Sequence, residues 1–142
     1  MVELLDLCYE QTQSKLSLRL EPDDEDSYKI HVSLEYGNIG HPIRHTFIIL
    51  RRDIEKIISS VPVTDHKTSR WIYTIEPSLT FFITPQGVLE QKKMFLFIVI
   101  LDAGMANSSF STETGPALAI RVTEDDLLDF AQQLSVEVAS LL

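Results

Sequence analysis

The side chains most able to do chemistry are two histidines and a glutamate in the first half of the chain. His31 and Glu35 alternate with apolar residues, which puts both on the exposed face of a predicted strand. His45 lies in the strand predicted next, and a metal ion held by these three side chains is one alternative. Their spacing lacks the close pairs typical of metal motifs. We therefore favour ordinary surface histidines and expect no metal and no cofactor.

Two further features are candidate nucleophiles. The Ser- and Thr-rich segment Asn107–Thr114 contains no Gly-x-Ser-x-Gly elbow, and we interpret it as a connecting loop. Cys8 is the only cysteine, which excludes an intramolecular disulfide. Its apolar neighbours favour a small buried side chain over a reactive thiol. We expect no catalytic residues and predict that the protein is not an enzyme.

An acidic run is the clearest charged feature of the sequence. Asp23, Asp24, Glu25 and Asp26 follow one another directly, and so many like charges favour a solvent-exposed loop. The run lacks the glycine and the flanking helices of a calcium-binding loop. It is either a solvated tip or a docking patch for a basic protein. Our candidate partner-binding residues are these four and Glu35 on the exposed strand face.

Charge limits the classes of ligand. The 142-residue chain carries 21 acidic and 12 basic residues and has a formal net charge of −9. Such a surface repels phosphate backbones, so we expect no nucleic-acid ligand, whereas it speeds association with basic partners. We see neither a signal peptide nor an apolar run of membrane-spanning length, and we expect a cytoplasmic protein that does not bind membranes.

The elements that must position these residues follow from hydrophobic periodicity. Apolar residues alternate over 16–20 and 28–36, which predicts a hairpin with the acidic run at its tip. In the first thirteen residues, Leu4, Leu5 and Cys8 have helical spacing. The remaining elements are predicted as a strand over 43–50, a helix over 52–61, interrupted strand material over 71–76 and 79–84, strands over 94–101 and 118–122, and a helix to the C-terminus.

Two of these elements carry stronger signals. The run Met94–Leu101 is apolar at every position, which predicts a central strand buried on both faces. Thr123 precedes the final helix, and Asp126 three residues later completes a pair typical of a capping box.

The two halves of the sequence repeat one pattern. Tyr28–Gly37 aligns with Phe95–Gly104, and Phe47–Val61 aligns with Ile120–Leu134. We interpret residues 15–61 and 78–142 as an internal repeat of three strands and a helix, joined by a connector over 62–70. Together they predict a single α+β domain over 1–142, whose mainly antiparallel sheet has about six strands with the helices packed on it.

Two segments resemble a known family. Ile75–Phe81 contains a Glu-Pro-x-Leu strand, and Leu118–Phe130 runs from a last strand into a C-terminal helix. Both resemble small bacterial immunity proteins of the wall-associated-protein (WapI) type. The resemblance implies a non-enzymatic inhibitor whose partner is a basic toxin or nuclease. An acidic surface suits that role because a nuclease has a basic cleft for its substrate.

Two alternatives stay open at this point. One is an assembly module that forms a homodimer through a sheet edge or a helix face. The other is an enzyme whose site we do not recognise. Trp71 and Tyr73, beside the connector, belong either to the core or, if exposed, to an interface.

Overall fold

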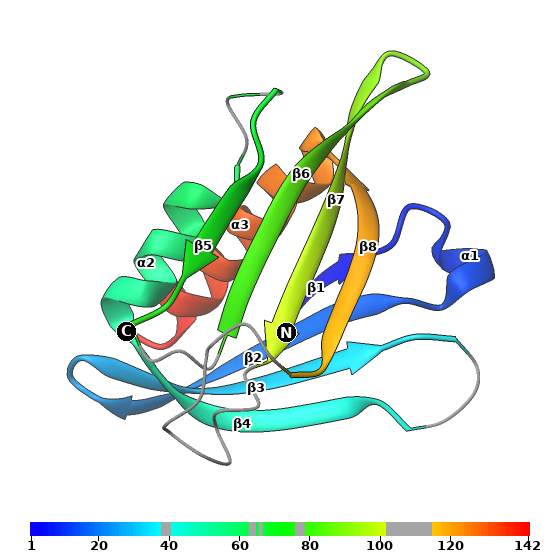
Figure 1. Ribbon diagram of the computed structural model, residues 1–142. Helices are drawn as coiled ribbons and strands as arrows, with labels where there is room; N and C mark the ends of the chain where they lie inside the picture. The colour runs from blue at the N-terminus through cyan, green and yellow to red at the C-terminus, as the bar shows by residue number, and fades with distance from the viewer. Residues whose placement is uncertain (38–40, 63–64, 66, 76–78, 102–114) are drawn as a thin grey trace.

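The computed structural model describes residues 1–37, 41–62, 65, 67–75, 79–101 and 115–142. It has an α+β fold with two four-stranded antiparallel sheets, which we call sheet A and sheet B (Figure 1). The predicted α+β class is therefore confirmed, whereas the single sheet of about six strands is wrong.

Sheet A contains the first four strands in chain order. These are β1 (Val2–Leu5), β2 (Lys15–Asp24), β3 (Ser27–Glu35) and β4 (Ile43–Leu50). Two helices belong to the same part of the chain, namely the single turn α1 (Tyr9–Thr12) and α2 (Arg51–Ser60).

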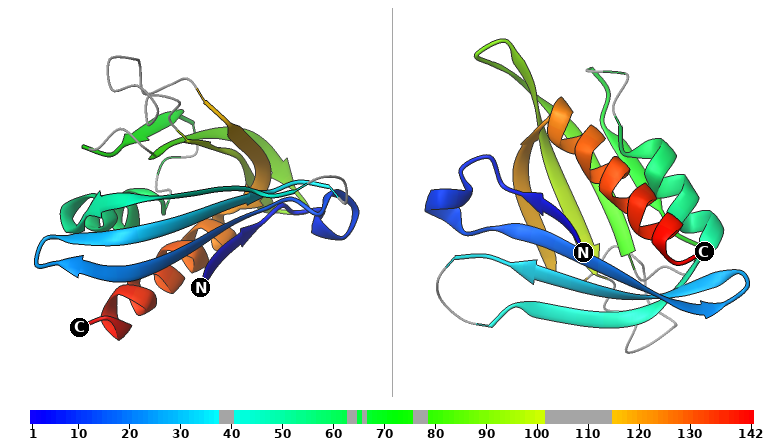
Figure 2. Two further views of the ribbon diagram at one scale, coloured as in Figure 1. Left: turned by 90° about the horizontal axis from the view of Figure 1, so that it is seen from below. Right: turned by 180° about the vertical axis from the view of Figure 1, so that it is seen from behind.

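Sheet B contains the other four strands, also in chain order. These are β5 (Arg70–Tyr73), β6 (Leu79–Leu89), β7 (Lys92–Leu101) and β8 (Ala117–Thr123). Helix α3 (Glu124–Ser140) follows β8 directly, as α2 follows β4. Both long helices lie behind sheet B in Figure 1, and the view from behind shows them side by side (Figure 2).

The strand count was underestimated because β1 and β5 have only four residues each. Four residues give too few alternations to reveal a strand, so Leu4 and Leu5 gave a helical pattern instead. The segment of β5 looked like the first part of one interrupted strand. Each half of the chain therefore has four strands and one long helix, and the first half also contains the single turn α1.

One hydrophobic cluster contains residues of both sheets and of both long helices. Phe97 of β7 lies near its centre, with ring centroids 5.2 Å from Phe81 and 6.1 Å from Phe130. The prediction for β7 is correct for one face only. Phe97 and its neighbours on that face are buried, whereas Leu96 and Ile98 on the other face are half-buried.

The two sheets share one pattern of strand pairing. A proline of the second strand faces an aromatic residue of the third strand, which in turn faces a β-branched residue of the fourth. These triplets are Pro22–Tyr28–Ile49 in sheet A and Pro85–Phe95–Val122 in sheet B. The register also shifts directly after each proline. A common origin of the two halves stays a prediction.

The start of α3 is confirmed in detail. Thr123 Oγ1 accepts a hydrogen bond from the Asp126 N–H at 3.2 Å, and Asp126 Oδ2 accepts one from the Thr123 N–H at 2.8 Å. This capping box pairs two N–H groups that the helix itself leaves free. Over the described part of the chain, no helix has the length and apolar character needed to cross a membrane.

Candidate functional site

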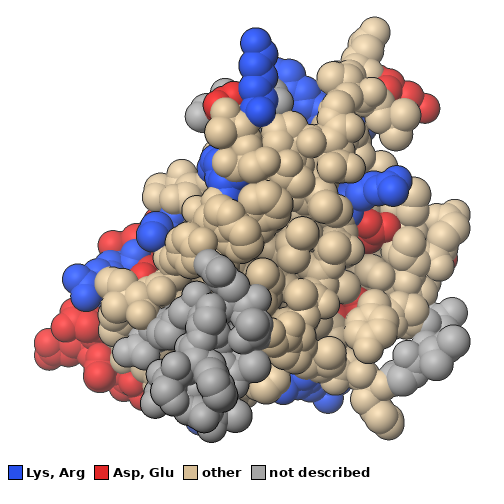
Figure 3. All heavy atoms as spheres, in the orientation of Figure 1, with Lys and Arg blue, Asp and Glu red and all other residues tan. Residues whose placement is uncertain are grey.

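The acidic run forms the tip of the hairpin between β2 and β3. Asp23, Asp24, Glu25 and Asp26 are all exposed, and Glu25 and Asp26 make the turn itself. The hairpin projects from one end of sheet A past the start of α2 (Figures 1 and 2). Acidic atoms gather in the corresponding place on the surface (Figure 3). We call these four residues the acidic tip.

Two carboxylates of the acidic tip accept hydrogen bonds within the turn. Asp24 Oδ1 accepts a hydrogen bond from the Asp26 N–H at 2.8 Å, which is an Asx turn. Asp23 Oδ2 accepts one from the Ser27 hydroxyl at 2.7 Å. Among the described residues, the side chains of Glu25 and Asp26 form no hydrogen bond. These two carboxylates are therefore available to a partner without disturbing the turn.

The acidic tip carries four formal negative charges. Hydrogen bonds from the Asp26 backbone N–H and from Ser27 lower the pKa of Asp24. Within the described residues none of the four acidic side chains forms an ion pair. Arg51 and Arg52 begin α2 close by, but the Arg51 guanidinium lies over the Tyr28 ring, 5.7 Å from its centroid. Among the described residues, the negative charge of the tip thus has no ion-pair partner.

Glu35 does not join the acidic tip. It ends β3 eight residues beyond Ser27, so it lies roughly 26 Å from the tip along the strand. Its carboxylate is 3.5 Å from Lys15 Nζ. Lys15 also contacts Glu3 at 2.5 Å, and mainly this hydrogen bond raises the pKa of Lys15. Glu35 therefore belongs to a separate cluster, in which Lys15 lies between two carboxylates.

The structure separates the two histidines of the candidate metal site. His31 pairs with Thr46 across β3 and β4, whereas His45 pairs with Val32 and so points to the opposite face of sheet A. The described residues contain no group of three or more His, Cys, Asp or Glu side chains arranged to hold a metal ion.

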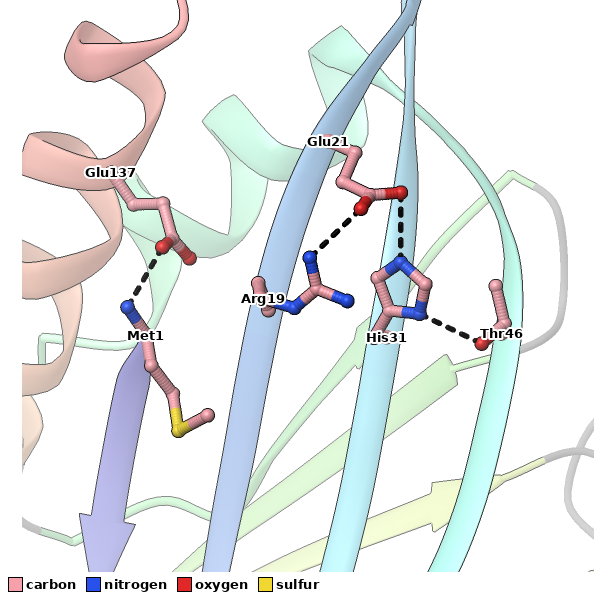
Figure 4. Close-up of polar contacts among 6 residues, drawn as sticks. All are labelled: Met1, Arg19, Glu21, His31, Thr46 and Glu137. Carbon is pink, nitrogen blue, oxygen red and sulfur yellow. Dashed lines mark hydrogen bonds and ion pairs between the residues drawn. The ribbon is translucent and has the colours of Figure 1, made fainter.

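A polar network that we did not predict from the sequence lies on the exposed face of sheet A (Figure 4). Glu21 lies at its centre, with Arg19 Nη1 donating to Oε1 at 2.8 Å and His31 Nε2 lying 3.0 Å from Oε2. The other ring nitrogen of His31 lies 2.9 Å from the Thr46 hydroxyl. The hydrogen bonds from His31 and then Arg19 lower the pKa of Glu21 to about 2. Regular pairing counted from the turn would have placed Arg19 opposite Val32, and the register shift between Pro22 and Asp24 brings it opposite His31 instead.

A shallow hollow of about 390 Å³ lies beside this network. Lys15, Arg19, His31 and Arg44 contribute to its lining. Lys15, Arg19 and His31 each lie within ion-pair distance of a glutamate. Among the described residues, Arg44 has no such partner.

The outer face of sheet B has a different character. Trp71 and Tyr73 are 46% and 38% exposed, and their rings stack with centroids 5.7 Å apart. Trp71 also lies 4.6 Å from Phe82 between ring centroids. The surface over β6, β7 and β8 in Figure 3 is mostly uncharged. Trp71 and Tyr73 are therefore exposed aromatic residues and not part of the core.

Two candidate nucleophiles from the sequence have different outcomes. Cys8 is exposed, which contradicts our prediction of a buried side chain, because it lies in the surface segment that leads into α1. Asn107–Thr114 lies outside the described residues.

Comparison with known protein families, with curated proteins and with solved structures finds no match to this chain.

Proposed function

We propose that the protein is a non-catalytic binding module whose acidic tip docks on a basic protein. The observation that carries the proposal is a projecting hairpin with four consecutive exposed acidic residues and no ion pair to them among the described residues. Because Asp23 and Asp24 fix the turn, Glu25 and Asp26 are presented in a defined conformation. A preorganised group loses little conformational entropy when it binds.

The partner class follows from charge and from the family resemblance. A net charge of −9 accelerates the approach of a basic protein over a distance of about one Debye length, roughly 8 Å at physiological salt. A basic toxin, such as a nuclease with a cleft for phosphates, matches this surface, and the resemblance to WapI-type immunity proteins suggests the same class. Inhibition would then consist of covering that cleft, with no chemistry by this chain.

The test is capture of a partner by matched baits from a lysate of the source cells at low salt. One bait is the unaltered protein and one is the tip variant Glu25→Gln/Asp26→Asn. The control variant Glu10→Gln/Asp125→Asn removes the same charge from two exposed side chains away from the tip. None of these four side chains forms a hydrogen bond or an ion pair among the described residues, so all baits should fold.

We expect a basic protein to be captured by the unaltered bait and the control variant, and about tenfold less of it by the tip variant. Capture that is equal with all three baits would contradict the role of the acidic tip. Capture of an acidic protein would contradict the partner class.

A further inference from the structure

Three of the four sheet edges have hydrogen bonds to groups outside their sheets. On β1, Gln133 of α3 accepts from the Glu3 N–H at 3.0 Å and donates to the Glu3 carbonyl at 3.2 Å. On β5, Lys56 of α2 donates to the Tyr73 carbonyl at 2.9 Å. On β8, the Arg121 carbonyl accepts from the Leu7 N–H at 2.8 Å. The edge strands β1, β5 and β8 thus each have at least one backbone group that is hydrogen-bonded outside the sheet.

The fourth edge, β4, is different. Its eight residues pair with β3 without any register shift, and they include no proline, glycine or lysine. In the described part of the chain, the backbone of β4 forms no hydrogen bond except to β3. Ile48 on its outer face is 42% exposed. Apart from the charged Arg44, this edge has none of the bulges, prolines or lysines that usually prevent pairing with another strand.

The charges at the two ends of this edge are complementary. Arg44, near the start of β4, is exposed, and within the described residues its guanidinium has neither a hydrogen bond nor an ion pair. Leu50, at the other end, pairs with Ser27, which directly follows Asp26 of the acidic tip. An antiparallel pairing of β4 with a second β4 brings the basic end of each strand to the acidic end of the other.

We propose that β4 is a homodimerisation edge, on which β4 of a second copy pairs antiparallel about a twofold axis and joins two copies of sheet A. Phe47 of each copy then faces Phe47 of the other, and Arg44 faces Leu50. From that position Arg44 is two strand spacings, or ~10 Å, from the β3 strand that begins beside Asp26. An extended arginine and an aspartate together span that gap.

The charge pairing also selects the second copy over other strands. Arg51 and Arg52 of α2 also lie at the Leu50 end, where the four acidic residues of the tip outnumber them. A strand from an acidic protein would be repelled at this tip, and a uniformly basic strand would be repelled at Arg44. Only a strand with a basic start and an acidic neighbour at its end matches both ends at once, and β4 itself has these features. The dimer uses Asp26 and leaves Glu25 free at each tip, and its formation does not depend on the proposed basic partner.

The test is sedimentation velocity of the full chain over about 1–100 µM, with three substitution samples. Arg44→Glu and Asp26→Lys are tested separately and as an equimolar mixture. Each variant places like charges at both symmetric contacts of its own dimer. In the mixture, the glutamate introduced at position 44 faces the lysine introduced at position 26 at one contact, and the native Arg44 faces the native Asp26 at the other.

We expect a concentration-dependent dimer for the unaltered chain and a dimer Kd raised about tenfold or more for each single variant. The equimolar mixture should recover dimer close to the unaltered level. Thermal unfolding serves as the folding control because both side chains are exposed. A monomer at every concentration, a dimer unchanged in both variants, or no recovery in the mixture would each overturn the proposal.

Discussion

The outer faces of the two sheets differ at positions that are equivalent in the fold. In sheet A the row across the second, third and fourth strands is Arg19–His31–Thr46. In sheet B the equivalent row is Phe82–Ile98–Ala119. The inner faces show no such difference, because both contribute aliphatic and aromatic side chains to one core.

This difference shows that strand register decides which positions point outwards but not which residue types occupy them. Each half buries one face of its sheet, which is enough to define the strands. The opposite face is then free to differ, and here one half has a polar network where the other has an apolar surface. Any specific binding must therefore be explained by side chains and not by the shared topology.

Substitution to lysine at one equivalent position in each sheet should change the free energy of unfolding by different amounts. We expect Ile98→Lys to lower the free energy of unfolding by about 1–3 kcal/mol, because a charge would replace a half-buried apolar group between Phe82 and Ala119. His31→Lys should change it by about 0.5 kcal/mol or less, since the new ammonium group can still pair with Glu21. Urea unfolding followed by circular dichroism measures both. Equal losses would show that the two outer faces have the same character.

The helices that follow the two sheets differ at their starts, which gives a smaller effect. Leu50 precedes α2 and supplies no side-chain cap, whereas Thr123 precedes α3 in a capping box. We expect Thr123→Ala to lower the free energy of unfolding by about 1 kcal/mol. The conservative change Thr123→Ser keeps the hydroxyl and should be close to neutral. If both substitutions had the same effect in thermal unfolding, the methyl group and not the cap would be responsible.

The smallest expected effect concerns the pH dependence of the polar network. The folded-state pKa of Glu21 is about 2, below its ordinary value of 4.5, so its ionised form stabilises the fold above about pH 4.5. This contribution is lost as the pH falls from there towards 2. The equivalent residue in sheet B is Thr84, which has no such titration.

An NMR titration of the Glu21 carboxyl group checks this prediction directly. We expect an apparent pKa near 2 in the unaltered protein and a higher value in His31→Ala, because the largest cause of the shift is removed. Glu21→Gln should flatten the dependence of the unfolding midpoint on pH over that range. A Glu21 pKa near 4.5 in the unaltered protein would mean that the network does not form in solution.

Much of the fold could be predicted from periodicity. The long strands of both hairpins, the two long helices and the Thr123 cap follow from alternation, helical spacing and one capping pair. The division into two sheets could not be predicted, because it depends on β1 and β5, which are short edge strands. Pro85 also resembles a turn residue, but a register shift and Gly87 at a φ of 97° let β6 continue past it.

Only the part of the candidate site that is formed by neighbouring residues in the sequence could be predicted. The acidic tip comes from consecutive residues, and the structure keeps them together at one turn. Glu35 lies on the same hairpin but at its far end, where Lys15 approaches from β2. The Arg19–Glu21–His31 network and the uncapped β4 edge depend on cross-strand register and on contacts between distant elements, which periodicity does not contain.

The most direct test of the central claim, that the acidic tip binds a basic protein, is the salt dependence of binding to the captured partner. Isothermal titration calorimetry at several salt concentrations would compare the unaltered chain, the Glu25→Gln/Asp26→Asn variant and the Glu10→Gln/Asp125→Asn control. We expect the tip variant to bind more weakly and with a shallower dependence of log Kd on log salt concentration than the control. Identical affinities and slopes for the two variants would contradict the claim.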